Sequence, residues 1–206
     1  MTRQCYNMPI RKKEVILMEN KTKLTTKKIV FTALMAALTT AGSALRITLP
    51  LEIAGTTSFH LGNILCALSG LLLGPWLGGL ASGIGSMIYD MLNPLYISEC
   101  WITFLFKGAY GLVAGLIAYS GRKEWNYGKA VLSTAAGALT YAVLYLAKSF
   151  FYNGLLLSGL TTDAALLTLL GKLPATTFNA VIAVVGAPLL AVAIRAALKK
   201  NHLTLK

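Results

Sequence analysis

Aromatic and cationic side chains recur at helical spacing between Lys129 and Tyr152. At about 100° per residue, one narrow helix face collects several of them. The face consists of Thr134, Ala138, Tyr141, Tyr145, Lys148 and Tyr152, three of which are tyrosines and one a lysine. Tyrosines can stack on a flat ring, and a lysine can bind an acidic or carbonyl group. An aromatic belt at a membrane surface is the alternative; it suits Tyr152 but not Tyr141, which lies too deep. The face therefore predicts one wall of a binding pocket.

Other apolar segments place polar groups at the same level. Lys172, Thr176 and Asn179 share a face, and Asp90 follows a run of small residues. The candidate ligand-binding residues are Asn63, Asp90, Trp101, Lys107, Tyr141, Tyr145, Lys148 and Asn179.

We expect three kinds of contact from these residues. Tyr141, Tyr145 and Trp101 would stack on or enclose a ring. The polar edge of the ligand would be read by Asn63, Asp90 and Asn179. Its acidic or carbonyl group would be held by Lys107 and Lys148.

Three further groups have two open interpretations each. Arg46 and Lys172 either line the pocket or extend to the outer headgroups, with equal weight. His60 is more often a hydrogen-bonded interface residue than a ligand contact. Of the four cations Arg46, Lys107, Lys148 and Lys172, the two that fit a binding site best are Lys107 and Lys148.

Catalytic and metal chemistry are poorly supported. The three cysteines (Cys5, Cys66 and Cys100) are scattered without metal-type spacing, and His60 and His202 are the only histidines. The chain has no nucleotide-binding loop, so any ATP-driven step would need a partner. We predict no enzyme activity, no cofactor and no metal site.

The composition is that of an integral membrane protein. Of 206 residues, 56% are apolar and 13% charged, with a mean hydropathy of +0.66; soluble domains carry about 25% charged residues. We predict an all-α membrane protein with six transmembrane helices in a domain spanning residues 28–200. The predicted helices are Lys28–Thr48, Phe59–Gly74, Pro75–Leu92, Ser98–Tyr119, Lys129–Tyr152 and Leu173–Leu198.

Charge distribution predicts the orientation. The net charge of +12 flanks the apolar runs instead of forming a groove with interleaved aromatics, which argues against nucleic acid. Most lysines and arginines lie in the tail 1–27, between residues 122 and 129, or near the C-terminus. With six helices these regions share one side, so both tails (1–27 and 201–206) are predicted to be cytoplasmic.

Two segments stand outside the six-helix pattern. Residues 155–170 are apolar but contain Gly159 and two threonines, which favours a re-entrant or interfacial piece over a seventh helix. Residues 1–27 lack the long apolar run of a signal peptide, and Met18 is an alternative start.

The central motifs resemble a known family. They are Leu61-Gly62-Asn63, Leu73-Gly74-Pro75-Trp76-Leu77-Gly78-Gly79, Gly83-Ile84-Gly85-Ser86, Tyr89-Asp90, Thr103-Phe104, Lys107-Gly108, Gly111 and Gly115. Their combination is similar to the substrate-binding S component of an energy-coupling factor (ECF) vitamin transporter, most closely the riboflavin-type branch. Many relatives carry an acid where this chain has Asn63, so riboflavin itself is not carried over.

The resemblance implies a function and partners. Such a subunit, in a bacterial cell membrane, would capture a vitamin or precursor from outside and associate with a transmembrane coupling subunit and two ATPases. The family's Ala-x-x-x-Ala docking face would correspond to Ala33, Ala37 and Ala41; packing within the subunit is the alternative. We expect a small heteroaromatic ligand. A stand-alone secondary carrier and a non-transporting scaffold subunit are the alternative functions.

Overall fold

The computed structural model describes residues 26–50, 56–121 and 126–201. Its elements run in order through six α-helices, one strand pair and two irregular helical segments. They are α2 (Thr26–Ala44), β1 (Arg46–Pro50), β2 (Thr56–His60), α3 (Gly62–Leu73), α4 (Pro75–Met91), the 3₁₀ helix η2 (Ile97–Glu99), α5 (Cys100–Tyr119), α6 (Tyr127–Lys148), the π-helix η3 (Ser149–Leu157) and α7 (Thr162–Lys200). The helical fold class is confirmed.

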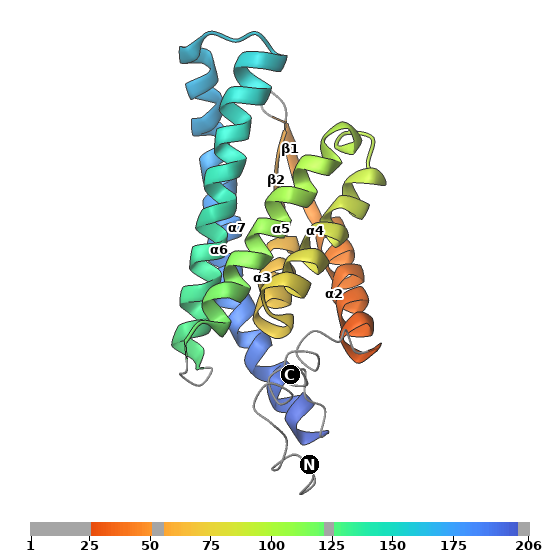
Figure 1. The fold of residues 1–206 in the computed structure, drawn as a ribbon. Helices are drawn as coiled ribbons and strands as arrows, with labels where there is room; N and C mark the ends of the chain where they lie inside the picture. The colour runs from red at the N-terminus through yellow and green to blue at the C-terminus, as the bar shows by residue number, and fades with distance from the viewer. Residues whose placement is uncertain (1–25, 51–55, 122–125, 202–206) are drawn as a thin grey trace, which may run out of the picture.

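The helices form one bundle around α3 and α5 (Figure 1). Helix α4 packs along α5 and α2, while α6 and α7 lie on the other side of α5 and α3. The Thr26 end of α2 and the Lys200 end of α7 lie together at the bottom of the view. The β1–β2 hairpin lies at the opposite end.

The antiparallel hairpin corrects two predicted helix boundaries. The first predicted helix was expected to reach Thr48 but ends at Ala44, and the second begins at Gly62 and not at Phe59. Arg46 pairs with His60 and Pro50 with Thr56. Apolar and polar residues alternate from Arg46 to Thr48, and β-branched residues stand in both strands, which is a strand pattern.

The predicted re-entrant piece at 155–170 is also wrong. The α6 helix continues as the π-helix η3 to Leu157, and after a short turn α7 begins at Thr162. The Thr161 hydroxyl accepts a hydrogen bond from the Ala164 N–H, which is an N-cap. Helix α7 then runs 39 residues without a break, through both Pro174 and Pro188. The prolines therefore do not end the helix in this bundle.

Glycines allow α3 and α4 to pack with their backbones close together. A Cβ at Gly78 would lie 2.6 Å from the Cα of Gly70 and from the Ser69 carbonyl oxygen. At Gly85 it would lie 2.3 Å from the Ala36 carbonyl oxygen on α2. Backbone atoms cannot move aside as a flexible side chain can. Small residues at these contacts are the usual device for close helix packing in membranes.

We therefore expect Gly78→Leu to separate α3 from α4 and to destabilise the protein. Overpacking of this kind typically costs about 1–3 kcal/mol, or more where the backbone is the obstacle. Thermal melting of the detergent-solubilised protein, followed by size-exclusion chromatography, measures the effect. The control is Gly128→Leu near the start of α6, where the nearest heavy atom to an added Cβ is 3.7 Å away. Equal melting temperatures for the two variants would contradict the packing argument.

Three helical stretches in the described residues are long and apolar enough to cross a membrane. They are Ile97–Tyr119, Tyr127–Leu157 and Thr162–Lys200. Helix α3, with 12 residues, is apolar but only about 18 Å long. Two of its last carbonyls nevertheless accept hydrogen bonds from side chains of the protein. Arg195 Nη2 donates to Leu71 O (2.6 Å), and the Tyr119 hydroxyl donates to Leu72 O (2.7 Å).

Candidate ligand-binding cavity

A cavity of about 380 Å³ lies among the hairpin and helices α2 to α7. Seven of the eight predicted ligand-binding residues line it: Asn63, Asp90, Lys107, Tyr141, Tyr145, Lys148 and Asn179. More than 100 residues separate the first of them, Asn63, from the last, Asn179, and the fold brings the seven together from five helices. Whether they contact a ligand remains a prediction.

Trp101 is the exception, because the structure does not place it in the cavity wall. Its side chain is 57% exposed, whereas Ile102, Thr103 and Phe106 line the cavity. One helical residue rotates the side chain by about 100°, which points Trp101 away from this face. The structure therefore gives no support to its predicted enclosing role.

The predicted α6 face also changes beyond Lys148. Tyr152 does not line the cavity, but Ser149 and Asn153 do. The cause is the π-helix, whose wider turn brings residues five apart onto one side. Lys148 and Asn153 therefore share the face that α-helical spacing assigns to Lys148 and Tyr152.

Lys107 forms one buried polar centre of the cavity. Its side chain is 3% exposed, and its ammonium donates to the Asn63 side-chain oxygen. The same ammonium lies 3.9 Å from the ring centroid of Tyr141, a cation–π contact. Tyr141 stacks between Tyr110 and Tyr145, with ring centroids 6.0 and 5.9 Å apart. A tyrosine ladder and a buried cation thus adjoin each other.

Asn179 holds the hairpin in the cavity wall. Its side-chain oxygen accepts from the His60 N–H (3.0 Å), and its Nδ2 donates to the Ser58 carbonyl (2.7 Å). One amide therefore pairs with two backbone groups at the free edge of β2, as a neighbouring strand would. We expected Asn179 to read the ligand; in this structure its first role is to position β2.

All three residues with open interpretations, Arg46, His60 and Lys172, line the cavity. Arg46 lies 4.1 Å from the ring centroid of Tyr89 and 4.9 Å from that of Tyr96, and its Nε donates to the Ser43 carbonyl. Nδ1 of His60 is buried and has no hydrogen-bond partner in the described part of the chain. Both belong to the cavity wall, and the His60 ring offers a ligand an unused polar atom.

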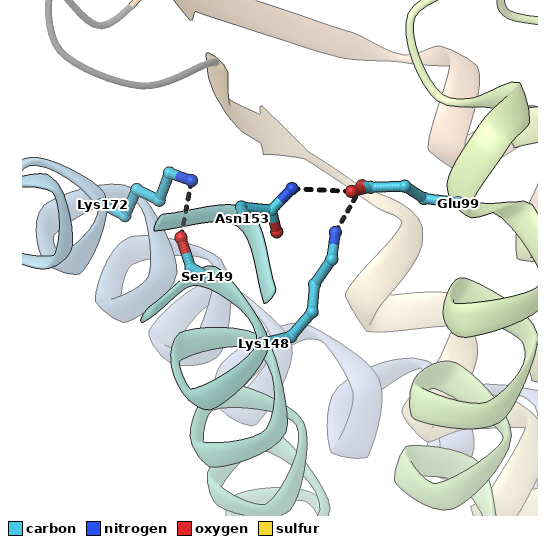
Figure 2. Close-up of polar contacts among 5 residues, drawn as sticks. All are labelled: Glu99, Lys148, Ser149, Asn153 and Lys172. Carbon is cyan, nitrogen blue, oxygen red and sulfur yellow. Dashed lines mark hydrogen bonds and ion pairs between the residues drawn. The ribbon is translucent and has the colours of Figure 1, made fainter. Parts of the chain in front are cut away.

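A second polar cluster joins η2, α6, η3 and α7 (Figure 2). Glu99 forms an ion pair with Lys148 through Oε2 and accepts from Asn153 Nδ2 through Oε1, at 2.7 Å. Beside this group, the Lys172 ammonium donates to the Ser149 hydroxyl at 2.6 Å. Lys148 was expected to be available to a ligand, but here it already has a carboxylate partner.

The cavity carries an excess of positive charge. Four cationic side chains line it among the described residues: Arg46, Lys107, Lys148 and Lys172. The carboxylates among those lining residues are Asp90 and Glu99. In the same described residues no group of His, Cys, Asp and Glu is arranged to hold a metal ion. The arrangement suits recognition of a small polar or acidic molecule.

Several lining residues were not among our candidates. Ser58, Tyr96, Glu99, Ser149 and Asn153 enter the wall through the hairpin, the loop before α5 and the π-helix. Helical periodicity does not address any of these segments. The strand alternation from Arg46 to Thr48 could have identified the hairpin, whereas we find no local sequence signal for the π-helix.

Known proteins identify this architecture. The family model described as "ECF-type riboflavin transporter, S component" matches residues 23–196. The chain belongs to this family. The S component fold also appears in a crystal structure of the S component for biotin from an ECF-type ABC transporter, with a TM-score of 0.57 and 15% identity. That match covers 82% of this chain and 94% of the other.

A curated relative has no stated activity. It is an uncharacterised protein from Pyrococcus woesei, 29% identical over 118 residues, which is 57% of this chain and 74% of that protein. The family match agrees with the resemblance seen in the sequence motifs. This chain is therefore the substrate-binding membrane subunit of an ECF-type transporter and not an enzyme.

Proposed function

We propose that this S component captures a small heteroaromatic vitamin or vitamin precursor at the outer face of a bacterial cell membrane. The observation that carries the proposal is the junction of the Tyr110–Tyr141–Tyr145 ladder with the buried Lys107. Stacked rings provide a surface for a flat ligand, and a few fixed polar groups orient it.

The proposed orientation places the hairpin end outside. Six transmembrane helices, with residues 28–200 as the domain, would put both tails in the cytoplasm. Support comes from the position of the helix ends: Thr26 and Lys200 lie at one end of the bundle and the hairpin at the other. The basic residues at these two helix ends, Lys27, Lys28, Lys199 and Lys200, lie at the former end, in line with the positive-inside tendency.

The proposed partners are one transmembrane coupling subunit and two ATPases. The family implies a coupling module in general terms, and the surface of α2 supplies a contact. Ala33, Ala37 and Ala41 are exposed on this helix, while Met35 and Ala36 are buried within the subunit. The exposed alanines are therefore not used for packing inside the chain, and they allow another helix to approach closely.

Purification from native membranes tests the proposal. The tagged chain is expected to co-elute with two ATPases and a coupling subunit, and to release a heteroaromatic compound on denaturation, detected by mass spectrometry. Ala37→Leu should reduce recovery of the partners several-fold and leave the released compound unchanged. The control is Ala193→Leu, at an exposed alanine on α7.

Two other results would contradict the proposal. Uptake into liposomes by the chain alone would indicate a secondary carrier. Recovery of neither partners nor a small molecule would indicate a scaffold subunit.

A further inference from the structure

Lys172 is a buried cation whose described partner is neutral. Its side chain is 6% exposed and projects from α7. The ammonium donates to the Ser149 hydroxyl at 2.6 Å and lies 6.0 Å from the ring centroid of Tyr145. Neither group carries a negative charge. Burying an ammonium in this way is costly unless an anion compensates it.

The neighbouring carboxylate is already engaged. Both oxygens of Glu99 have partners, Lys148 on one and Asn153 on the other (Figure 2). Its charge is balanced by Lys148, with which it forms an ion pair. Among the residues drawn there, Lys172 is thus one positive charge in excess.

The polar groups beside Lys172 are hydrogen-bond donors that line the same cavity. Ser149, Lys148 and Asn153 come from consecutive turns at the α6–η3 junction, and all three line the cavity with Lys172. A hydroxyl, an amide and two ammonium groups match the oxygens of a carboxylate or phosphate, which form their strongest hydrogen bonds with charged donors. Tyr145 stands next to this group, so a ring on the tyrosine ladder could carry the acidic substituent.

We propose that Lys172, Ser149 and Lys148 form an anion subsite that binds a carboxylate or phosphate group of the ligand. The inference rests on the proposed function and narrows it: the captured compound is an acid at neutral pH, and its ring lies on the tyrosines. A neutral vitamin would leave the surplus charge of Lys172 uncompensated.

The experiment compares matched probes that share a ring. The pairs are nicotinamide with nicotinate, pyridoxine with pyridoxine 5′-phosphate, and riboflavin with its 5′-phosphate. Binding to the ligand-depleted protein is measured by calorimetry, and the compound released from freshly purified protein is identified by mass spectrometry. We expect that compound to be acidic and the acidic member of a pair that binds to be preferred about tenfold or more, which is the effect of one charge-assisted hydrogen bond. The nicotinate pair tests a carboxylate and the other two pairs test a phosphate, so the comparison shows which of the two groups the subsite prefers.

Two variants separate binding from folding. Lys172→Gln keeps a donor for Ser149 and removes the charge, so the preference for acids should fall below about twofold. Lys172→Met removes both; since it deletes a buried, uncompensated charge, the ligand-free protein should melt about 2–4 °C higher. Lys200→Met, at an exposed residue, is the control and should change neither quantity.

The outcomes are decisive in each direction. A released compound that is neutral, equal binding of both members of a pair, or an acid preference that survives Lys172→Gln would overturn the anion subsite and leave the proposed capture function standing. A lower melting temperature of Lys172→Met would indicate a structural lysine and would also overturn it. Failure both to bind any probe and to release any compound would remove the capture function itself.

Discussion

Asn179→Leu is expected to lower the affinity for the ligand about 100-fold while the helical bundle remains folded. The substitution removes both hydrogen bonds between α7 and the edge of β2. Each unpaired buried backbone group costs about 1–3 kcal/mol, and about 3 kcal/mol corresponds to roughly 100-fold in affinity. The hairpin, which carries Thr57, Ser58 and His60 into the wall, would no longer be held in place.

The measurement is calorimetric titration of the ligand-depleted variant with the compound released from the wild-type protein. Thr168→Val is the matched control, because Thr168 is a buried residue of α7 whose hydroxyl bonds only within its own helix. It should bind within about threefold of the wild type, since the substitution removes only the two local bonds of one hydroxyl. An Asn179→Leu variant that binds equally well would show that the hairpin does not depend on this amide.

Lys107→Met is expected to lower the affinity for the ligand to a comparable extent. The ammonium is buried, bonded to Asn63 and placed against Tyr141, so it presents a fixed charge beside the proposed ring site. The variant loses a charge-assisted bond to the ligand, worth about 1.5–3 kcal/mol, and Asn63 loses the partner that orders it. We therefore expect the affinity for the ligand to fall about 10- to 100-fold or more.

Asn63→Asp changes the charge beside Lys107 while it keeps the shape of the side chain. The aspartate is nearly isosteric and can still accept from Lys107, but it neutralises the ammonium. For an acidic ligand we expect about a tenfold loss, in line with one charge-assisted interaction, and for a neutral one little change. Binding titrations and melting curves are both needed. A Lys107→Met protein that melts earlier but binds normally would assign Lys107 to the structure and not to the ligand.

The helix faces were predictable from the sequence because they depend on local periodicity. Tyr141, Tyr145 and Lys148 recur every three to four residues, and the bundle directs that face inward, against Lys107 on α5. The same reasoning failed where the backbone leaves the α-helix. The hairpin interrupts the first two predicted helices, and the π-helix moves Asn153 into the wall in place of Tyr152.

Pairing between distant residues could not be predicted. Nothing local to Asn179 indicates that its amide binds β2, about 120 residues earlier in the chain. Likewise, Lys148 and Glu99 are an ion pair because the fold places the last residue of α6 beside the 3₁₀ turn before α5. The sequence identified which groups are polar and deep; the fold decides which of them are already occupied.

The short helix α3 bears on how the protein responds to bilayer thickness. Because Arg195 and Tyr119 donate to the Leu71 and Leu72 carbonyls, these two groups at the end of α3 do not need water or headgroups as partners. The helix can therefore stay at one depth in bilayers with shorter or longer acyl chains, while the longer α6 and α7 adapt by tilting. Asn63, the α3 residue that we predict to contact the ligand, would then keep its geometry regardless of hydrocarbon thickness.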